Sequence, residues 1–436
     1  MKKIITIIVI IFLLALTGIG YFVFTNTNQQ TINPGTVFDN VKNFFPFGKP
    51  DTQTETQVST STDSNDNTQQ IQEPKVTERM FQISSAPTAG YVSFDVISTS
   101  TLAEQTSISF GTSTFATTST STKAKIVSAS STKQTDTFVR FMERVTGHIY
   151  EVKIPTLEKK QISNLTSPKV YNAVFNSNGS EVISRQLNNE NIATTYTKLS
   201  TSTSNTNRSY PNNTDILITK KDSVFYTTKS QNGSVGYIST FDNKKTTQIF
   251  STPLRDILAE WSGGDIVAIF PKPHSEYSGV LSFIDTKKGT FKQVLSGING
   301  LTALPNSDAT YFLYNTNSKN LNLAAQKISS GLDINFQNKT LPEKCVWSKK
   351  NINLVYCAIP TYISESGYPE KWYQGVISFS DKVWVLDVQT GEERLVYNPS
   401  IDNKPLPDIT SLTLNDKENY LFFINKNDLT LWGLSL

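Results

Sequence analysis

The sequence is poor in the residues from which most metal and redox sites are built. Its 436 residues include only two cysteines and two histidines. Neither His148 nor His274 stands in a zinc-binding spacing such as HExxH, and Cys345 and Cys357 form no CxxC pair. P-loop, GxGxxG, GxSxG and calcium-loop motifs are also missing. We therefore expect neither a metal nor a cofactor.

Charge is scarce as well. Charged residues make up 18% of the chain, and the net charge at pH 7 is +3. Nucleic-acid-binding proteins carry a strong basic patch or stripe, which this composition does not provide. We expect no nucleic-acid partner.

What the sequence does contain is a repeated hairpin pattern. Six of seven copies start 43 residues apart, and the seventh follows after 67 residues, which is one period plus 24 residues. Each copy joins an apolar residue, a few turn-forming residues and an apolar, β-branched or aromatic run, which is typical of a β-hairpin. The copies start at Thr132, Phe175, Ile218, Trp261, Leu304, Trp347 and Leu414.

A second hairpin follows in most copies, most clearly where Lys382 to Val388 precedes Glu393 to Tyr397. Each unit is therefore expected to hold four short strands. Such units at this spacing indicate a β-propeller, because each blade buries its faces against its neighbours. A β-sandwich predicts no fixed period, and a solenoid coil is far shorter. The expected fold is all-β, a seven-bladed β-propeller of four-stranded antiparallel blades.

The last repeat has sequence for only three strands, at Ile409 to Leu414, Tyr420 to Asn425 and Leu429 to Leu436. We predict that Arg79 to Ser84 supplies the fourth, because its Gln-Ile-Ser before a proline matches the ends of other units. Pairing the two ends of the domain closes the ring and removes an exposed sheet edge.

The N-terminal region predicts a membrane anchor. After a cytoplasmic N-terminus at residues 1–3, residues 4–24 are uncharged and long enough to span a bilayer core. Lys2 and Lys3 favour a cytoplasmic N-terminus. A cleaved signal peptide ending near Gly20 is the alternative, but the apolar run continues past that site to Phe24. We expect a single-pass bacterial cell-membrane protein with its propeller on the outer face.

Two further segments separate the anchor from the propeller, which is assigned to residues 78–436. Residues 25–48 have an amphipathic pattern, which fits a helix lying in the membrane interface or one docked on the propeller. Residues 49–77 are rich in Ser, Thr, Gln and Asn and are expected to be a disordered linker. A similar tract, Ser98 to Thr122, interrupts the first blade as a hairpin insertion or an extra strand pair, and its low complexity favours the insertion.

The two cysteines flank one hairpin turn. With the turn centred near residue 351, Cys345 and Cys357 can face each other on adjacent strands, where only a modest adjustment of the backbone lets them bond. We predict a disulfide, as suits an extracytoplasmic domain. The alternative is a pair of buried thiols.

Two of the connections between the second and third strands of a blade are longer than the rest, at Pro271 to Ser278 and Thr361 to Asp381. Both belong to the same end of a propeller. Aromatic side chains in such loops supply contact area for a partner. The alternative is that the longer insertion folds down as a lid. The candidate ligand-binding residues are Tyr368, Trp372, Tyr373, Phe379, His274 and Tyr277.

The segments Phe175-Asn-Ser-Asn-Gly-Ser, Trp261-Ser-Gly-Gly and Trp347-Ser-Lys-Lys resemble the turn between the two innermost strands of TolB-like and WD-repeat-like propellers. The resemblance covers about Arg79 to Leu436, although the Trp-Asp dipeptide of WD repeats is missing. It implies a periplasmic binding or scaffolding module.

Two functions of different classes fit these observations. The first is a membrane-tethered, non-catalytic module that binds a protein, a peptide or a cell-envelope polymer. The second is a glycan-active hydrolase or lyase with carboxylates at the channel mouth, for which Asp256, Glu260 and Asp265 are candidates. The sialidase-type Asp-box is missing, and a buried carboxylate cluster in the channel would favour the enzyme.

Overall fold

The computed structural model describes residues 78–101, 131–164, 166–188, 191–199, 207–211, 214–261, 264–317, 320–364 and 367–436. The predicted anchor at 4–24, amphipathic segment at 25–48 and linker at 49–77 lie outside these residues, so they and the domain boundaries stay predictions. In the described ranges, no helix is long and apolar enough to cross a membrane.

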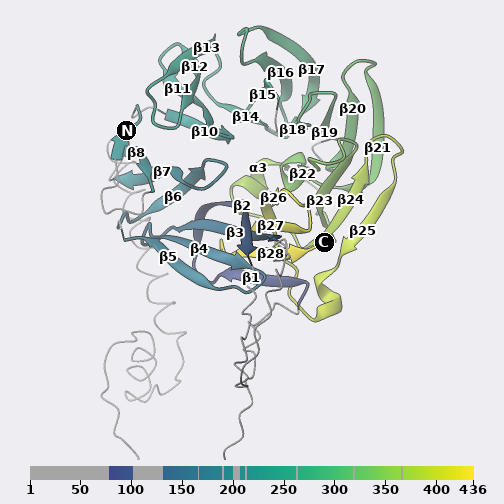
Figure 1. The fold of residues 1–436 in the computed structure, drawn as a ribbon. Helices are drawn as coiled ribbons and strands as arrows, with labels where there is room; N and C mark the ends of the chain where they lie inside the picture. Colours follow the sequence, from purple (N-terminus) through teal and green to yellow (C-terminus); the bar gives the residue numbers. More distant parts are fainter. Residues whose placement is uncertain are drawn as a thin grey trace, which may run out of the picture. The chain divides into compact units, whose positions relative to one another are not determined.

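The structure confirms an all-β fold of seven four-stranded antiparallel sheets, arranged as the blades of a propeller (Figure 1). Blade 1 contains β2 (Thr88–Thr101), β3 (Ser131–Glu143), β4 (Ile149–Ile154) and β5 (Lys159–Ser163). Blade 2 contains β6 (Val170–Phe175), β7 (Glu181–Asn188), β8 (Asn191–Lys198) and β9 (Asn207–Ser209). Blade 3 contains β10 (Thr214–Lys220), β11 (Ser223–Ser230), β12 (Gly233–Thr240) and β13 (Thr246–Thr252).

The remaining blades complete the ring. Blade 4 contains β14 (Ile257–Glu260), β15 (Ile266–Pro271), β16 (Ser278–Asp285) and β17 (Phe291–Asn299). Blade 5 contains β18 (Ala303–Pro305), β19 (Tyr311–Asn317), β20 (Asn322–Lys327) and β21 (Leu332–Lys339). Blade 6 contains β22 (Cys345–Trp347), β23 (Leu354–Pro360), β24 (Asp381–Asp387) and β25 (Glu393–Tyr397). Blade 7 contains β26 (Ile409–Leu414), β27 (Tyr420–Asn425) and β28 (Leu431–Ser435), with β1 (Met80–Ser84) as its outermost strand.

The closing strand is the one that the sequence predicts. β1 pairs antiparallel with β28, so that Met80 lies opposite Leu434. Phe81 from this strand packs in one buried cluster with Leu431 of blade 7 and Phe141 of blade 1. The two ends of the domain therefore hold each other in place.

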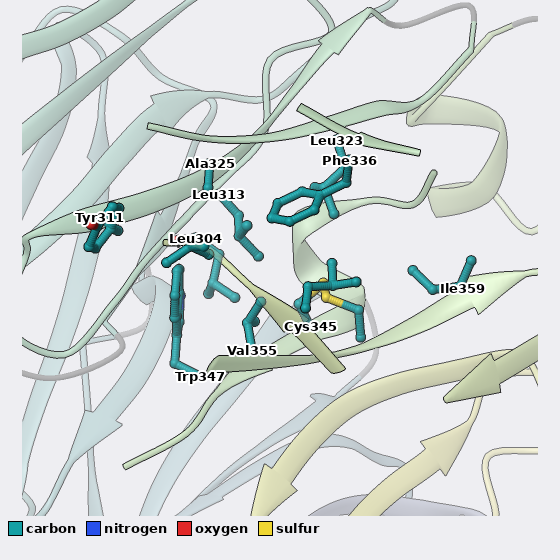
Figure 2. Close-up of a cluster of buried hydrophobic side chains, with 13 residues drawn as sticks. Leu304, Tyr311, Leu313, Leu323, Ala325, Phe336, Cys345, Trp347, Val355 and Ile359 are labelled. Carbon is teal, nitrogen blue, oxygen red and sulfur yellow. Dashed lines mark hydrogen bonds between the residues drawn. A yellow bond between two sulfur atoms is a disulfide. The ribbon is translucent and has the colours of Figure 1, made fainter. Parts of the chain in front are cut away.

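The core lies between blades, where apolar side chains of neighbouring sheets interdigitate. Figure 2 shows one such cluster, between blades 5 and 6. The indole nitrogen of Trp347 donates to the carbonyl oxygen of Leu304 at 3.2 Å, and these two residues are 43 positions apart. The sequence period thus equals the spacing of positions that touch across adjacent blades.

The disulfide is confirmed. Cys345 and Cys357 are direct partners on β22 and β23 and are bonded to each other, with their Cα atoms 4.1 Å apart. The bond lies inside the cluster between blades 5 and 6 (Figure 2). It ties the innermost strand of blade 6 to the second strand.

The first hairpin is longer than expected. β2 continues to Thr101 and β3 begins at Ser131, with these two residues paired. The predicted insertion from Ser98 to Thr122 therefore starts too early, because its first residues extend the strand. These residues read Ser-Thr-Ser-Thr, and the β-branched threonines suit an extended strand. Residues 102–130 lie outside the described part of the chain.

Candidate ligand-binding face

One end of the propeller carries the connections between the second and third strands of each blade and those from one blade to the next. We call this end the insertion face. It includes residues 272–277 between β15 and β16 of blade 4, and residues 361–380 between β23 and β24 of blade 6. The second segment contains the short helix α3 (Glu370–Tyr373), which lies over the middle of the ring of blades in Figure 1.

The longer segment folds down as a lid. Tyr368, Trp372 and Phe379 are only 1%, 3% and 4% exposed. Phe379 stacks on both other rings, with centroid distances of 5.7 and 6.1 Å. The cluster is completed by Leu321 and Leu341, which lie in two connections of the insertion face. These aromatic residues anchor the segment instead of facing solvent.

A buried ion cluster fixes the lid from below. The Lys344 ammonium, fully buried, lies 2.9 Å from an Asp381 oxygen and 2.6 Å from an Asp408 oxygen. Asp408 also accepts hydrogen bonds from Trp372 Nε1 at 2.9 Å and from the Phe379 backbone at 3.1 Å. One carboxylate thus links the lid to the connection between blades 6 and 7.

The two carboxylates of this cluster, Asp381 and Asp408, differ in the hydrogen bonds that they accept. Asp381 accepts from Lys344 and from the Ile409 backbone through one oxygen, whereas its Oδ1 has no hydrogen-bond partner among the described residues. Burial raises the pKa of Asp381 to about 6, although the Lys344 charge opposes this shift. Because its burial outweighs the Lys344 charge, Asp381 is the carboxylate that takes up a proton as the pH falls.

The two long connections are joined to each other. Ser275 donates its hydroxyl and its backbone N–H to the Glu370 carboxylate, the backbone bond to Oε2 being 3.0 Å long. His274 lies 4.0 Å from the same group. Burial acts to raise the pKa of Glu370, but the bonds from Ser275 and the nearby His274 bring it below its ordinary value. A single carboxylate therefore holds the blade 4 loop against the lid of blade 6.

A second acidic group lies below α3. The Tyr373 hydroxyl donates to a carboxylate oxygen of Glu343. Burial raises the pKa of Glu343, and it raises that of Glu260 on β14 to about 8, with a further contribution from the Glu343 charge. Burial and the neighbouring Glu343 also hold the pKa of Tyr373 well above its ordinary value. At neutral pH, Glu260 is therefore a protonated carboxylic acid.

The sequence-derived candidates fall into two groups. Tyr368, Trp372 and Phe379 are buried in the lid and offer no contact surface to a ligand, and the partly buried Tyr373 of the same segment donates its hydroxyl to Glu343. Tyr277 is 70% exposed and its ring lies 4.9 Å from that of His274. Binding by any of these residues stays a prediction, and the exposed pair is where it applies most directly.

The enzyme candidates are not brought together. Asp256 precedes β14 and forms an ion pair with Lys229 at 2.9 Å, while Asp265 follows the strand at its other end and pairs with Lys287 at 2.7 Å. Both aspartates are largely solvent-accessible. Asp256 shares Lys229 with the Asp215 carboxylate, which lies 3.1 Å from the ammonium, and Glu260 has the Glu343 carboxyl group in its surroundings. Within the described ranges, no group of three or more His, Cys, Asp or Glu side chains could hold a metal ion.

Several residues that organise this face had no sequence signal. Lys344 and Asp408 come from two separate connections, Asp381 is the first residue of β24, and the three meet only in the folded chain. Nothing in the sequence distinguishes Lys344 from a surface lysine. Asp381 directly follows the long insertion, and this location is the one sequence feature that draws attention to it.

The described chain is thus a seven-bladed β-propeller with a lidded insertion face. No protein-family model matches it, and no curated protein matches it. Among solved structures it is similar to TolB from Acinetobacter baumannii, with 12% identity and a TM-score of 0.39 over 58% of this chain and 59% of that chain. The match thus spans about three fifths of either chain. A likeness of this size implies no activity or partner for this chain.

Proposed function

We propose that the protein is a membrane-tethered, extracytoplasmic β-propeller that binds a protein, a peptide or a cell-envelope polymer without catalysing a reaction. The proposed surface is the insertion face. The observation that carries the proposal is the Ser275–Glu370 link, because it joins two long connections from different blades into one surface. Propellers commonly use such loops for recognition while the blades act as a rigid support.

Two exposed aromatic side chains are the proposed contact residues. Tyr277 is 70% exposed in the blade 4 connection, and Tyr362 is 77% exposed at the start of the lid. Tyrosine is favoured in interfaces, because it offers a large contact area and a hydroxyl group at a small entropic cost. The buried lid aromatics hold the backbone that presents them.

The proposed location rests on the sequence and on the disulfide. Residues 4–24 fit a membrane-spanning helix with a cytoplasmic N-terminus. Disulfides persist in oxidising compartments, so the Cys345–Cys357 bond supports a propeller outside the cytoplasm of a bacterial cell.

The proposal is tested with the full chain in native membranes. The measurement is the amount of a specific envelope component that copurifies with the protein. The double variant Tyr277→Ala, Tyr362→Ala should retain at least fivefold less of this component than the unaltered protein. Leu332→Ala is the matched control, since Leu332 is 68% exposed and begins β21 at the other end of the propeller. Equal recovery by the double variant and the control would contradict the proposal.

One observation favours a second function, a glycan-active enzyme. Glu260 keeps its proton to about pH 8 and lies near Glu343, so the two could serve as a proton donor and its partner. Tyr373, the last residue of α3, donates its hydroxyl to Glu343, so a substrate would have to displace α3 to reach Glu343. Release of reducing ends from isolated envelope glycans, abolished in Glu260→Gln, would support this function over the first.

A further inference from the structure

A cavity of about 220 Å³ lies between blades 1 and 2. We call it the blade 1–2 pocket. Gly147 and Ser167 border it from two connections of the insertion face, and the strands β3, β4, β5, β7 and β8 form its walls. Its volume is large enough for several water molecules or one small organic ring. The lining residues share a hydroxyl-rich, uncharged character.

Seven of the lining side chains are polar, and none of the described residues that line the pocket is ionisable. Ser163, Ser184 and Thr197 are 5%, 6% and 5% exposed, so their hydroxyl groups belong to the interior. Met142 and Ile149 form an apolar patch. The other polar lining residues are Thr166, Ser167, Gln186 and Thr195.

The pocket lies where blade 2 has a small side chain at a position at which two other blades carry a large ring. In three blades the first hairpin turn is closed by an asparagine whose side chain accepts from the backbone five residues later, at Asn176, Asn306 and Asn415. Eight residues after this asparagine, blade 5 has Tyr314 and blade 7 has Phe423, which are 4% and 0% exposed.

Blade 2 has Ser184 at that position. In the other two blades, the large ring packs against the preceding blade. In blade 2, a small hydroxyl side chain leaves that volume open towards blade 1. Thr195 lies directly opposite Ser184 on β8 and adds a second hydroxyl to the same wall. The cavity therefore follows from the side chains that this sequence places at one blade interface.

We propose that the blade 1–2 pocket binds a neutral sugar ring, such as one unit of a cell-envelope polymer. A sugar hydroxyl both donates and accepts, and Ser and Thr hydroxyl groups rotate to meet either role. A charged ligand would lose its hydration with no opposite charge in the lining. The C–H face of a sugar ring matches the apolar patch of Met142 and Ile149. The proposed function allows a protein, a peptide or a cell-envelope polymer as the ligand, and this inference rests on the polymer being the ligand.

Saturation-transfer NMR on the full chain, kept in a detergent without a sugar headgroup, provides the test. The probes are glucose, galactose and N-acetylglucosamine, compared with glucuronic acid and glucosamine as charged analogues. We expect at least one neutral sugar to bind with a dissociation constant on the order of 1 mM. The charged analogue should bind at least tenfold more weakly.

Two neighbouring threonines provide a matched pair of variants. Thr195→Val keeps the side-chain shape and removes a pocket hydroxyl, and should weaken binding about fivefold. Thr194→Val makes the same change at the next residue, which does not line the pocket. The Thr194 hydroxyl has no partner among the described residues, so its removal should leave both folding and sugar binding unchanged.

A third variant separates loss of binding from loss of folding. Ser184→Phe restores the ring that other blades carry, so it should fold, fill the pocket and abolish the signal. Water as the only occupant, with no saturable sugar signal at tens of millimolar, would overturn the proposal. Binding that survives both Thr195→Val and Ser184→Phe would overturn it as well. Recognition through Tyr277 and Tyr362 is measured separately, so its failure and that of the pocket are distinguishable.

Discussion

Replacement of Trp372 tests whether the long insertion is an anchored lid. The Trp372 side chain is 3% exposed, packs on Phe379 and donates from Nε1 to Asp408 at 2.9 Å. Trp372→Phe keeps most of the ring contact and removes the hydrogen bond to a charged acceptor. This should lower the free energy of unfolding by about 2 kcal/mol.

Trp372→Ala removes the ring as well. Truncation of a buried tryptophan costs about 3–5 kcal/mol, because packing is lost and a cavity remains. With an unfolding entropy of about 2 cal/mol/K per residue, the midpoint should fall by about 3 °C for Trp372→Phe and about 6 °C for Trp372→Ala. The assay is thermal unfolding of the full chain, monitored by circular dichroism and repeated in urea.

Tyr362→Ala is the internal control for this series. Tyr362 belongs to the same insertion but is 77% exposed, so its replacement should shift the midpoint by less than about 1 °C. If Trp372→Ala were also silent, the insertion would not be anchored as described. Trp372 would then be free to act as a contact residue, as the sequence alone suggested.

Three further predictions concern protonation, the disulfide and ring closure. Folded Glu260 holds its proton to about pH 8, whereas the unfolded group releases it near 4.5, so the free energy of unfolding should fall as pH rises through this window. Glu260→Gln should flatten that slope in urea titrations, and an unchanged slope would exclude Glu260 as its source. Reduction of Cys345–Cys357 should cost about 3 kcal/mol by the loop-entropy relation, measured against a Cys345→Ala, Cys357→Ala variant that reductant leaves unaffected. Deletion of Leu429–Leu436 should abolish folding, because it removes β28 from between β27 and β1; a soluble truncation with unchanged melting would refute this closure.

Much of the fold is visible in the sequence, for a physical reason. Each blade packs only against its neighbours, so equivalent positions must recur at the blade spacing, as Leu304 and Trp347 do. Closure was predictable because the last repeat lacks one strand and β1 carries the matching pattern. The disulfide followed from the symmetric placement of its cysteines about one turn.

The candidate site was much less predictable. The positions of aromatic residues in a loop do not show which of their side chains are buried. Trp372 is buried because its indole nitrogen donates to Asp408, which is itself paired with Lys344. These two residues are 64 positions apart and come from different connections. The blade 1–2 pocket was also invisible, because a serine such as Ser184 is informative only when its blade partners are aligned in space.

Site-specific photo-crosslinking in native membranes tests the central claim most directly. A photoreactive side chain at Tyr277 samples the insertion face, and one at Leu332 samples an exposed apolar position at the other end of the propeller. Recognition through the insertion face predicts a discrete adduct from Tyr277 that Leu332 does not give. Adducts of equal yield from both positions, or from Leu332 alone, would contradict the account.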